Sequence, residues 1–237
     1  DVECLAVGLT GLHGRTPDAA GLRACLPVGW RVDRLRAVDD SIAAYLCGLG
    51  SRPGVVVVVG TGVAAVAWAG ADRWAHGDGR GPVLGDRGGG FWIGLRALRQ
   101  VCGSLDGVDP ATDLLGLAEA RYGHRSEFSR LLAWDPSVVA RIAGFCVDVV
   151  AAADAGDAVA RDLIGDAAQE LRRTTVATAR RAGLDGATAG FTMVGEVARA
   201  GEILVGPWRD GVVADEPHLR WVDSDRTPLD GLADLTM

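Results

Sequence analysis

The sequence predicts an α/β fold in which helices pack on a central sheet. Three observations indicate it: the β-branched run Val55–Val59, the helical apolar periodicity over Asp157–Ala182, and the return to a strand pattern at Phe191–Val194. The chain has 237 residues, of which 49% are hydrophobic and 23% charged. That length and composition fit one large globular domain or two small domains packed together.

The first fifty residues predict two strands, each followed by a helix. We expect a buried strand at Cys4–Gly8 and a short helix that Pro17 opens and that ends at Cys25. A second strand is expected at Leu35–Val38, and a helix over Ser41–Leu49. Val55–Val59 then has the pattern of a strand that is buried on both faces.

A cluster of glycine, serine and proline separates these elements from the valine run. Gly50–Gly54 is the best candidate for a domain boundary, because these residues interrupt regular structure. After the valine run, Gly60–Gly62 predicts a tight turn, and strands are expected at Val63–Trp68 and Ala71–His76.

The remainder of the chain is predominantly helical in pattern. Helices are expected over Phe91–Leu105 and throughout Asp109–Gly183, with Gly183 itself closing the last of them. After the strand at Phe191–Val194, Gly195 is expected to begin a helix that runs to about Leu204. A final amphipathic turn is predicted at Leu229–Leu235.

The basic residues exclude several kinds of site. All 24 are arginine, and lysine is absent from the sequence. A P-loop, a protein kinase and a pyridoxal enzyme each need a lysine. If the chain handles a nucleotide, it therefore does so by another route.

The net charge and the cysteine pattern argue against several kinds of binding partner. The net charge is −7 without a basic stripe, so nucleic acid and membrane surfaces are poor partners. No apolar run approaches the ~18 residues of a spanning helix, and Asp1–Thr10 has no signal-peptide pattern, so we expect a cytoplasmic protein. The five cysteines are scattered and predict small core residues rather than a metal site. The seven tryptophans are expected to be packing anchors.

Two segments that follow predicted strands could carry chemistry. Gly60-Thr61-Gly62 could form a nest of backbone N–H groups for phosphate, or a plain hairpin turn. Asp40 stands between a strand and a helix, where a carboxylate could accept a proton or orient a metal-bound water. Alternatively, Asp39 or Asp40 simply caps the helix.

Two further glycine segments also leave alternatives open. Gly85–Gly90 could let a ligand approach the backbone, with Asp86 accepting bonds from sugar hydroxyls, or it could be a flexible connector. Val194–Val197 could receive an adenine or a phosphate, or be an ordinary strand-to-helix turn. The four histidines stand in unrelated segments, and a G-x-S-x-G elbow is absent, so a hydrolase triad is unsupported.

In their order along the chain, these segments resemble the N-acetylglucosamine kinase family, within the BadF/BadG/BcrA/BcrD-type ATPases of the actin-like superfamily. Several weak motifs in one order are more specific than any one alone. The matching segments are Val38–Ala44, Val55–Gly62, Gly77–Gly81, Gly85–Gly94, Ile142–Cys146, Ala155–Ala160 and Val194–Val197.

The resemblance implies two ribonuclease H-like lobes with ATP and Mg²⁺ in the cleft between them. Residues 1–52 would be the remnant of an N-terminal lobe, since the family's opening D-G-G-G-T phosphate hairpin is not in this sequence. Residues 53–237 would form the C-terminal lobe with a helical insertion, and the last helix could return to the first lobe.

The resemblance also assigns roles. Asp40 would be the base that takes the sugar hydroxyl proton, and no residue is assigned to metal. Nucleotide contacts would come from Gly60, Thr61, Gly62, Ala143, Gly195 and Glu196, and sugar contacts from Gly79, Arg80, Gly81 and Asp86.

The sequence departs from the family pattern at Val63, Arg80, Arg87 and Glu196. Arg80 could favour an anionic sugar substituent or point outward. The function we expect is an ATP-dependent kinase of an N-acetylated or amino hexose, with a homodimer as its common oligomer. The alternatives are a non-catalytic sugar or nucleotide sensor, and an ATPase subunit of a BadF-type activator.

Overall fold

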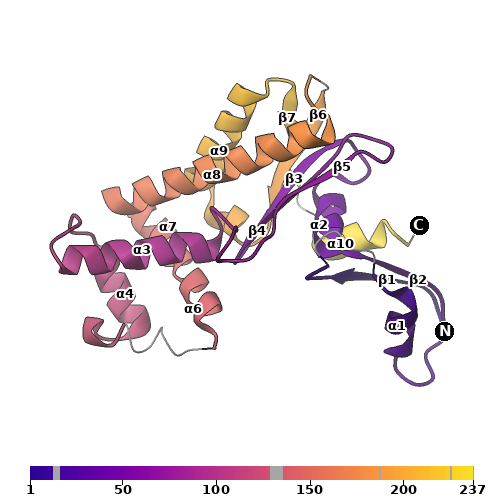
Figure 1. The fold of residues 1–237 in the computed structure, drawn as a ribbon, viewed down its shortest axis with the longest axis horizontal. Helices are drawn as coiled ribbons and strands as arrows, with labels where there is room; N and C mark the ends of the chain where they lie inside the picture. Colours follow the sequence, from indigo (N-terminus) through magenta and orange to yellow (C-terminus); the bar gives the residue numbers. More distant parts are fainter. Residues whose placement is uncertain (13–16, 129–135, 187, 225, 237) are drawn as a thin grey trace.

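Two sheets organise the chain, and they lie towards one end and the middle of an elongated molecule (Figure 1). The computed structural model describes residues 1–12, 17–128, 136–186, 188–224 and 226–236. The smaller sheet pairs β1 (Val2–Leu9) with β2 (Val32–Asp39) in parallel. The larger sheet has five strands in the order β5-β4-β3-β6-β7.

The larger sheet mixes antiparallel and parallel pairs. β3 (Gly54–Val59), β4 (Val63–Trp68) and β5 (Trp74–Asp78) form an antiparallel meander. β6 (Ala189–Val194) pairs in parallel with the other edge of β3, and β7 (Leu219–Trp221) pairs in parallel with β6. The α/β class and the predicted strands are confirmed, although β5 begins and ends later than predicted.

The helices follow the predicted pattern closely. In α8, Gly183 closes the last turn in the left-handed conformation, as the sequence predicts, and the structure adds that the Asp157 carboxylate caps the first turn. Residues 129–135, within the stretch predicted to be helical, lie outside the described residues. The helices are α1 (Ala19–Ala24), α2 (Asp40–Leu49), α3 (Gly90–Leu105), α4 (Leu114–Tyr122), α6 (Val138–Gly144), α7 (Cys146–Ala155), α8 (Ala158–Ala182), α9 (Glu202–Asp215) and α10 (Pro228–Ala233), with the 3-10 turns η1 (Arg125–Glu127) and η2 (Val197–Ala200).

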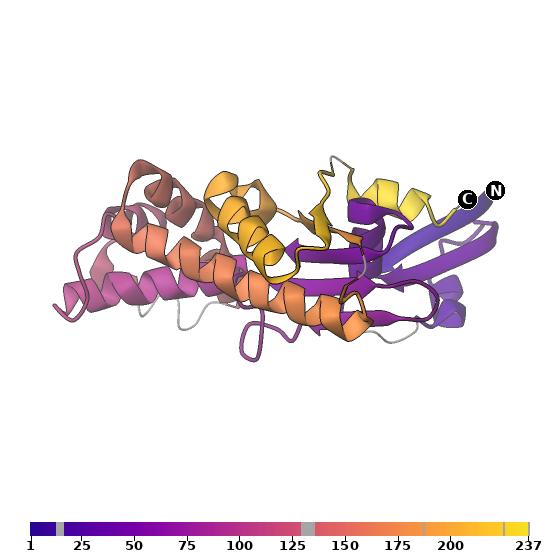
Figure 2. The same ribbon diagram turned by 90° about the horizontal axis from the view of Figure 1, so that it is seen from above.

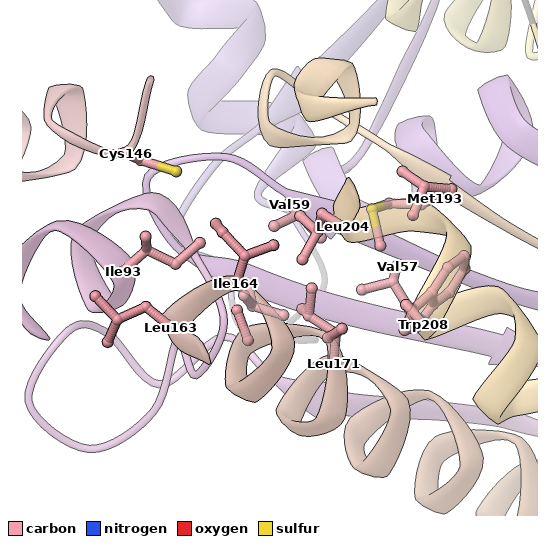
Figure 3. Packing of buried hydrophobic residues seen from close by; sticks show 14 of the residues in the cluster. Val57, Val59, Ile93, Cys146, Leu163, Ile164, Leu171, Met193, Leu204 and Trp208 are labelled. Atoms are coloured by element: carbon pink, nitrogen blue, oxygen red, sulfur yellow. The ribbon is translucent and has the colours of Figure 1, made fainter. Parts of the chain in front are cut away.

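The main core lies between the larger sheet and the helices α3, α7, α8 and α9. Figure 3 shows Val57 and Val59 of β3 facing Leu171 of α8 and Leu204 of α9. All four side chains are buried. Burial of this many aliphatic groups fixes β3 as the rigid centre of the fold.

The opposite face of the sheet carries a smaller cluster. Tyr45 and Leu49 of α2 pack there on Val56 and Val66. α10 packs in turn on α2, where Gly231 comes so close that a Cβ would lie 2.4 Å from the Ala43 carbonyl oxygen. Both views place α10 and the two chain ends beside the small sheet (Figures 1 and 2).

Two predictions about the elements are wrong in part. The strand at Cys4–Gly8 forms, but none of the residues of β1 is buried. Its main neighbours among the described elements are β2, α2 and α10, which leave much of the strand uncovered. The segment after Gly195 is not one helix: η2 covers Val197–Ala200, and α9 starts only after Gly201, whose φ of +79° interrupts the helix.

Burial of the cysteines and tryptophans also differs from the prediction. Cys47 and Cys146 are buried as expected, whereas Cys4 is half-buried and Cys25 and Cys102 are exposed. Trp208 is fully buried, but Trp30 and Trp74 are 54% and 41% exposed, and Trp134 lies outside the described residues. None of the helices in the described ranges combines the length and apolarity that crossing a bilayer requires.

Candidate active site

A cavity of about 590 Å³ opens where the two sheets approach each other. Four places supply its lining: the end of β1, the start of α2, the β3–β4 hairpin and the end of β5. Strand ends and helix starts present free polar groups, so this arrangement suits a polar ligand. The lining includes Thr10, Asp39, Asp40, Gly60, Gly62, Val63, His76, Asp78, Gly79 and Arg80.

Asp40 points its carboxylate at this cavity because its neighbour does the capping. The Asp39 side chain accepts the Ser41 N–H at 3.0 Å and the Ser41 hydroxyl at 2.5 Å. Asp39 is thus the N-cap of α2, and Asp40 stands in the first helical turn. Of the two capping alternatives that the sequence left open, Asp39 is the one that forms. The exposed Asp40 carboxylate stays available to a ligand.

The surroundings of Asp40 raise its pKa. The first cause is partial burial, which disfavours the charged carboxylate, and the second is repulsion by the Asp39 carboxylate. A hydrogen bond with the Thr10 hydroxyl acts in the opposite direction. A carboxylate with a raised pKa binds a proton more tightly, which favours its use as a general base.

The hairpin between β3 and β4 is held by the start of α3. The Gly60 N–H donates to the Gly62 carbonyl at 2.9 Å and closes the turn. The Gly90 N–H donates to the Gly60 carbonyl at 2.8 Å, and the Phe91 N–H donates to the Thr61 carbonyl at 2.9 Å. Among the described residues, the N–H groups of Thr61 and Gly62 find no acceptor. The turn therefore keeps two donors for an anion such as a phosphate.

The loop after β5 is fixed to the same hairpin. The Asp78 carboxylate accepts the Asp86 N–H at 2.7 Å and the Arg87 N–H at 3.2 Å. Asp86 is 8% exposed and accepts the Val63 N–H at 3.2 Å. Burial raises the pKa of Asp86, and the bond from Val63 counteracts this. The segment Gly85–Gly90 is thus a packed support for the hairpin rather than a free connector.

Glycine is required where this loop and the hairpin touch. A Cβ on Gly62 would lie 2.5 Å from an Asp86 carboxylate oxygen, and one on Gly89 would lie 3.0 Å from the Gly62 carbonyl carbon. The first distance is shorter than real Cβ contacts, and the second is so tight that the neighbouring backbone would have to shift. The glycine-rich sequence is explained by this contact.

A second cavity, of about 500 Å³, meets the first at Gly60. Thr61 lines it from the hairpin, Ala143 from α6 and Glu196 from the turn after β6. The remaining walls are mostly apolar, being formed by Gly90, Ala140, Gly144, Cys146, Val147, Val150, Val197, Arg199 and Ala200. An apolar cavity beside a turn with free N–H donors suits a ligand that has both an apolar part and an anionic part.

Gly195 shapes one wall of this second cavity without lining it. Its φ is +109°, and a Cβ there would lie 2.5 Å from the Val59 carbonyl oxygen. Only glycine therefore fits beside the end of β3, and the turn carries Glu196 to the cavity. Gly195 itself lines a neighbouring cavity of about 600 Å³ between α2 and β6.

The structure brings most of the predicted residues to the two cavities. Gly81, Asp86 and Gly195 are the exceptions, since they line neither. The first cavity receives Asp40, Gly60, Gly62, Gly79 and Arg80, and the second receives Gly60, Thr61, Ala143 and Glu196.

Two polar residues of the site were missed from the sequence. Thr10 follows β1 directly, and its hydroxyl bonds to Asp40. Asp78 ends β5 and holds the supporting loop with both carboxylate oxygens. A signal existed for Asp78, because a lone acid flanked by Gly77 and Gly79 at a strand end marks a backbone-binding turn. Within the described ranges, no three histidine, cysteine, aspartate or glutamate side chains come together as a metal-binding group.

Comparison with solved structures places this fold among sugar kinases. A Chromobacterium violaceum protein named as a candidate N-acetylglucosamine kinase superposes with a TM-score of 0.75 at 24% identity, covering 99% of this chain and 75% of that one. A ROK family glucokinase from Streptomyces griseus, solved with glucose and AMPPNP, gives 0.53 at 18% identity, covering 86% and 67%. At these identities the likeness establishes the fold.

Curated relatives share part of the sequence. The glucosamine kinase GspK of Vibrio cholerae is 27% identical over 139 residues, which are 58% of this chain and 46% of that protein. The N-acetyl-D-glucosamine kinase of Dictyostelium discoideum is 30% identical over 152 residues, covering 62% and 47%. An N-acetylmuramic acid/N-acetylglucosamine kinase of Clostridium acetobutylicum is 26% identical over 172 residues, covering 71% and 56%. The chain spans about half the length of these relatives.

A family profile matches most of the sequence. The profile of the BadF/BadG/BcrA/BcrD ATPase family matches residues 1–212, which include both cavities and the hairpin that joins them. On this match, the chain belongs to the BadF/BadG/BcrA/BcrD ATPase family.

Proposed function

We propose that this protein is an ATP-dependent kinase of an N-acetylated or amino hexose. The observation that carries the proposal is the meeting of two unlike cavities at Gly60. One is polar and holds an exposed carboxylate, and the other is mostly apolar. Transfer of a phosphoryl group from a nucleotide to a sugar needs a site for each of the two molecules. The two sites must adjoin, because the transferred group passes from one to the other.

In this proposal the hairpin positions the phosphates. Thr61 and Gly62 offer backbone N–H donors that no described residue uses, and the Thr61 hydroxyl adds another. Ala143 and Glu196 line the cavity that would hold the adenosine. These groups bind and orient, which is most of what phosphoryl transfer asks of a protein.

Asp40 would act as the general base. A sugar in the first cavity would place one hydroxyl against this carboxylate, which accepts the proton as the oxygen attacks the terminal phosphorus. The bond between that phosphorus and the leaving ADP breaks at the same time. Thr10 bonds to Asp40 and would hold the carboxylate in its orientation.

The residues at the cleft also fit a nucleotide that enters with Mg²⁺. When bound, Mg²⁺ neutralises phosphate charge, and it commonly takes phosphate oxygens and waters as ligands with one or two carboxylates. Asp39 and Asp40 both line the first cavity at the start of α2, and they are the carboxylates that would face such an ion. We also propose the division into lobes 1–52 and 53–237, with α10 packed back on α2, and a cytoplasmic location where ATP is supplied.

The test is the variant Asp40→Asn, assayed for ADP release with glucosamine and with N-acetylglucosamine. We expect kcat to fall by about 10²–10⁴, the scale of a lost general base, while a non-hydrolysed ATP analogue still binds in calorimetry. Asp33→Asn is the matched control, because Asp33 is exposed on β2 and lines none of the cavities described above. Unchanged turnover in Asp40→Asn would refute the assignment.

One observation favours a second candidate, a sensor that binds without turnover. Val63 lines the first cavity where the family motif has a serine, so a hydroxyl beside the hairpin is lost. Sugar and nucleotide binding in calorimetry, without any ADP release from the unaltered protein, would select this candidate.

A further inference from the structure

Arg80 brings a positive charge to the first cavity, which is the acceptor cavity that would hold the sugar. It lines the same cavity as Asp40 and is exposed. Among the described residues, its guanidinium makes no ion pair or hydrogen bond, and the nearest acid in sequence, Asp78, has both oxygens occupied by backbone N–H groups. The other arginine of this loop, Arg87, is by contrast paired with Glu170 at 3.7 Å.

The backbone that carries Arg80 is firmly held. The preceding Gly79 donates its N–H to the Val63 carbonyl at 2.8 Å, and Gly85 donates to the Gly81 carbonyl at 2.9 Å. A Cβ on Gly85 would lie 3.1 Å from the Cβ of Arg80, so the missing side chain makes room for the arginine stem. The turn thus fixes the root of Arg80 next to the hairpin and leaves only its outer part to move.

An acidic sugar would bind in this cavity only if a positive charge offset the negative charges already there. Asp39 and Asp40 supply negative charge from α2, and they would repel a sugar that bears a carboxylate. A guanidinium binds a carboxylate with two parallel hydrogen bonds and cannot be deprotonated in proteins. Arg80 can therefore offset the repulsion from Asp39 and Asp40 and favour a sugar that bears a carboxylate.

We propose that Arg80 determines specificity for an amino sugar that carries a carboxylate substituent. The proposal rests on the proposed function, because it names the substrate class of that same acceptor cavity. The competing source of the same chemistry is a nucleotide phosphate, since the turn of Arg80 is bonded to Val63 beside the hairpin.

The test compares N-acetylmuramic acid, whose lactyl group bears a carboxylate, with its uncharged methyl ester. Their dissociation constants are measured by calorimetry in the unaltered protein, in Arg80→Gln and in Arg80→Lys. We expect the preference for the acid to fall by about 10- to 100-fold in Arg80→Gln, the range of a lost charge-assisted hydrogen bond, and to fall less in Arg80→Lys. Arg99→Gln, which removes an exposed arginine of α3 outside the cavities described above, should keep the full preference.

Several outcomes overturn the proposal. They are an equal affinity for acid and ester in the unaltered protein, no binding of either, and a preference that survives in Arg80→Gln. If Arg80→Gln instead weakens the ATP analogue and leaves the sugar preference intact, the side chain serves a phosphate. Because these readouts are binding constants, they are independent of the Asp40→Asn turnover test, so failure of either proposal can be distinguished from failure of the other.

Discussion

The two sheets of this protein differ sharply in burial, and the proposed site lies where they meet. In β3, Val55, Val56, Val57 and Val59 are fully buried, whereas β1 has no buried residue. The turn that would hold phosphate belongs to the buried sheet, and Asp40 follows β2 of the exposed one. The proposed phosphate turn therefore has a rigid support in the larger sheet, whereas Asp40 follows a sheet that is less well buried.

The helix α2 couples the two supports. Its start receives the chain from β2, and farther along its Tyr45 and Leu49 are buried against the larger sheet. The Tyr45 hydroxyl also donates to the Arg52 carbonyl at 2.6 Å, just before β3. The position of Asp40 is therefore set mainly by how α2 packs on the rigid sheet, rather than by β2.

The largest effect we expect is on the rigid side, in Trp208→Ala. Trp208 is fully buried, stacks edge-on with Phe191 and donates its indole N–H to the Thr175 hydroxyl at 3.0 Å. Removing it leaves a cavity and takes away the hydrogen bond that the Thr175 hydroxyl accepts, although that hydroxyl still donates to the Leu171 carbonyl at 2.7 Å. The free energy of unfolding should therefore fall by about 3–5 kcal/mol. Urea denaturation followed by circular dichroism measures it.

The substitution that tests the stability contribution of the exposed sheet is Val7→Ala in β1. Val7 is only half-buried, so the same measurement should show a loss below about 1 kcal/mol. Equal losses in Trp208→Ala and Val7→Ala would mean that the two sheets do not differ in their contribution to stability.

An effect between those of Trp208→Ala and Val7→Ala is expected for Gly195→Ala, where the rigid sheet borders the second cavity. The left-handed φ and the close approach to Val59 together should cost about 2 kcal/mol of stability, and the turn should shift Glu196 out of place. Calorimetry should then show weaker binding of an ATP analogue and unchanged binding of the sugar. Loss of both affinities to the same extent would contradict a local role for Gly195.

Sequence reasoning predicted the rigid sheet better than the exposed one. The valine run of β3 and the apolar spacing of α8 are local patterns, and both elements formed as predicted. The strand at Cys4–Gly8 has the same apolar character, but burial depends on which elements adjoin it, and a pattern cannot supply that. The break at Gly201 inside a helical pattern was missed because a single glycine is compatible with both a helix and a turn.

The candidate site shows the same limit. The family motifs led to Gly60 and Asp40, which the structure brings to one cavity. They did not distinguish a residue that lines a cavity from one that supports it, as with the buried Asp86 behind the hairpin. Nor could they find Thr10, which reaches Asp40 because the parallel pairing of β1 with β2 sets Leu9 opposite Asp39.

The smallest effect concerns the stability contribution of Asp40 itself. Because the folded protein raises the pKa of this carboxyl, the folded state binds its proton more tightly than the unfolded state does. Stability contributed by this group is therefore present below the unfolded pKa and is lost as the pH rises through the folded pKa. At neutral pH the charged Asp40 opposes folding slightly, so Asp40→Asn should raise the melting temperature a little while it lowers kcat by about 10²–10⁴.

The pH dependence separates this cause from a simple change in packing. The gain in Asp40→Asn should be present at neutral pH and should vanish below pH 3.8, the ordinary value for an aspartate. In the unaltered protein, turnover should fall as the pH is lowered through a midpoint above 3.8, where the base becomes protonated. A melting temperature that drops in Asp40→Asn at neutral pH would mean that the charged carboxylate stabilises α2. The start of α2 would then not be the less stable of the two supports of the site.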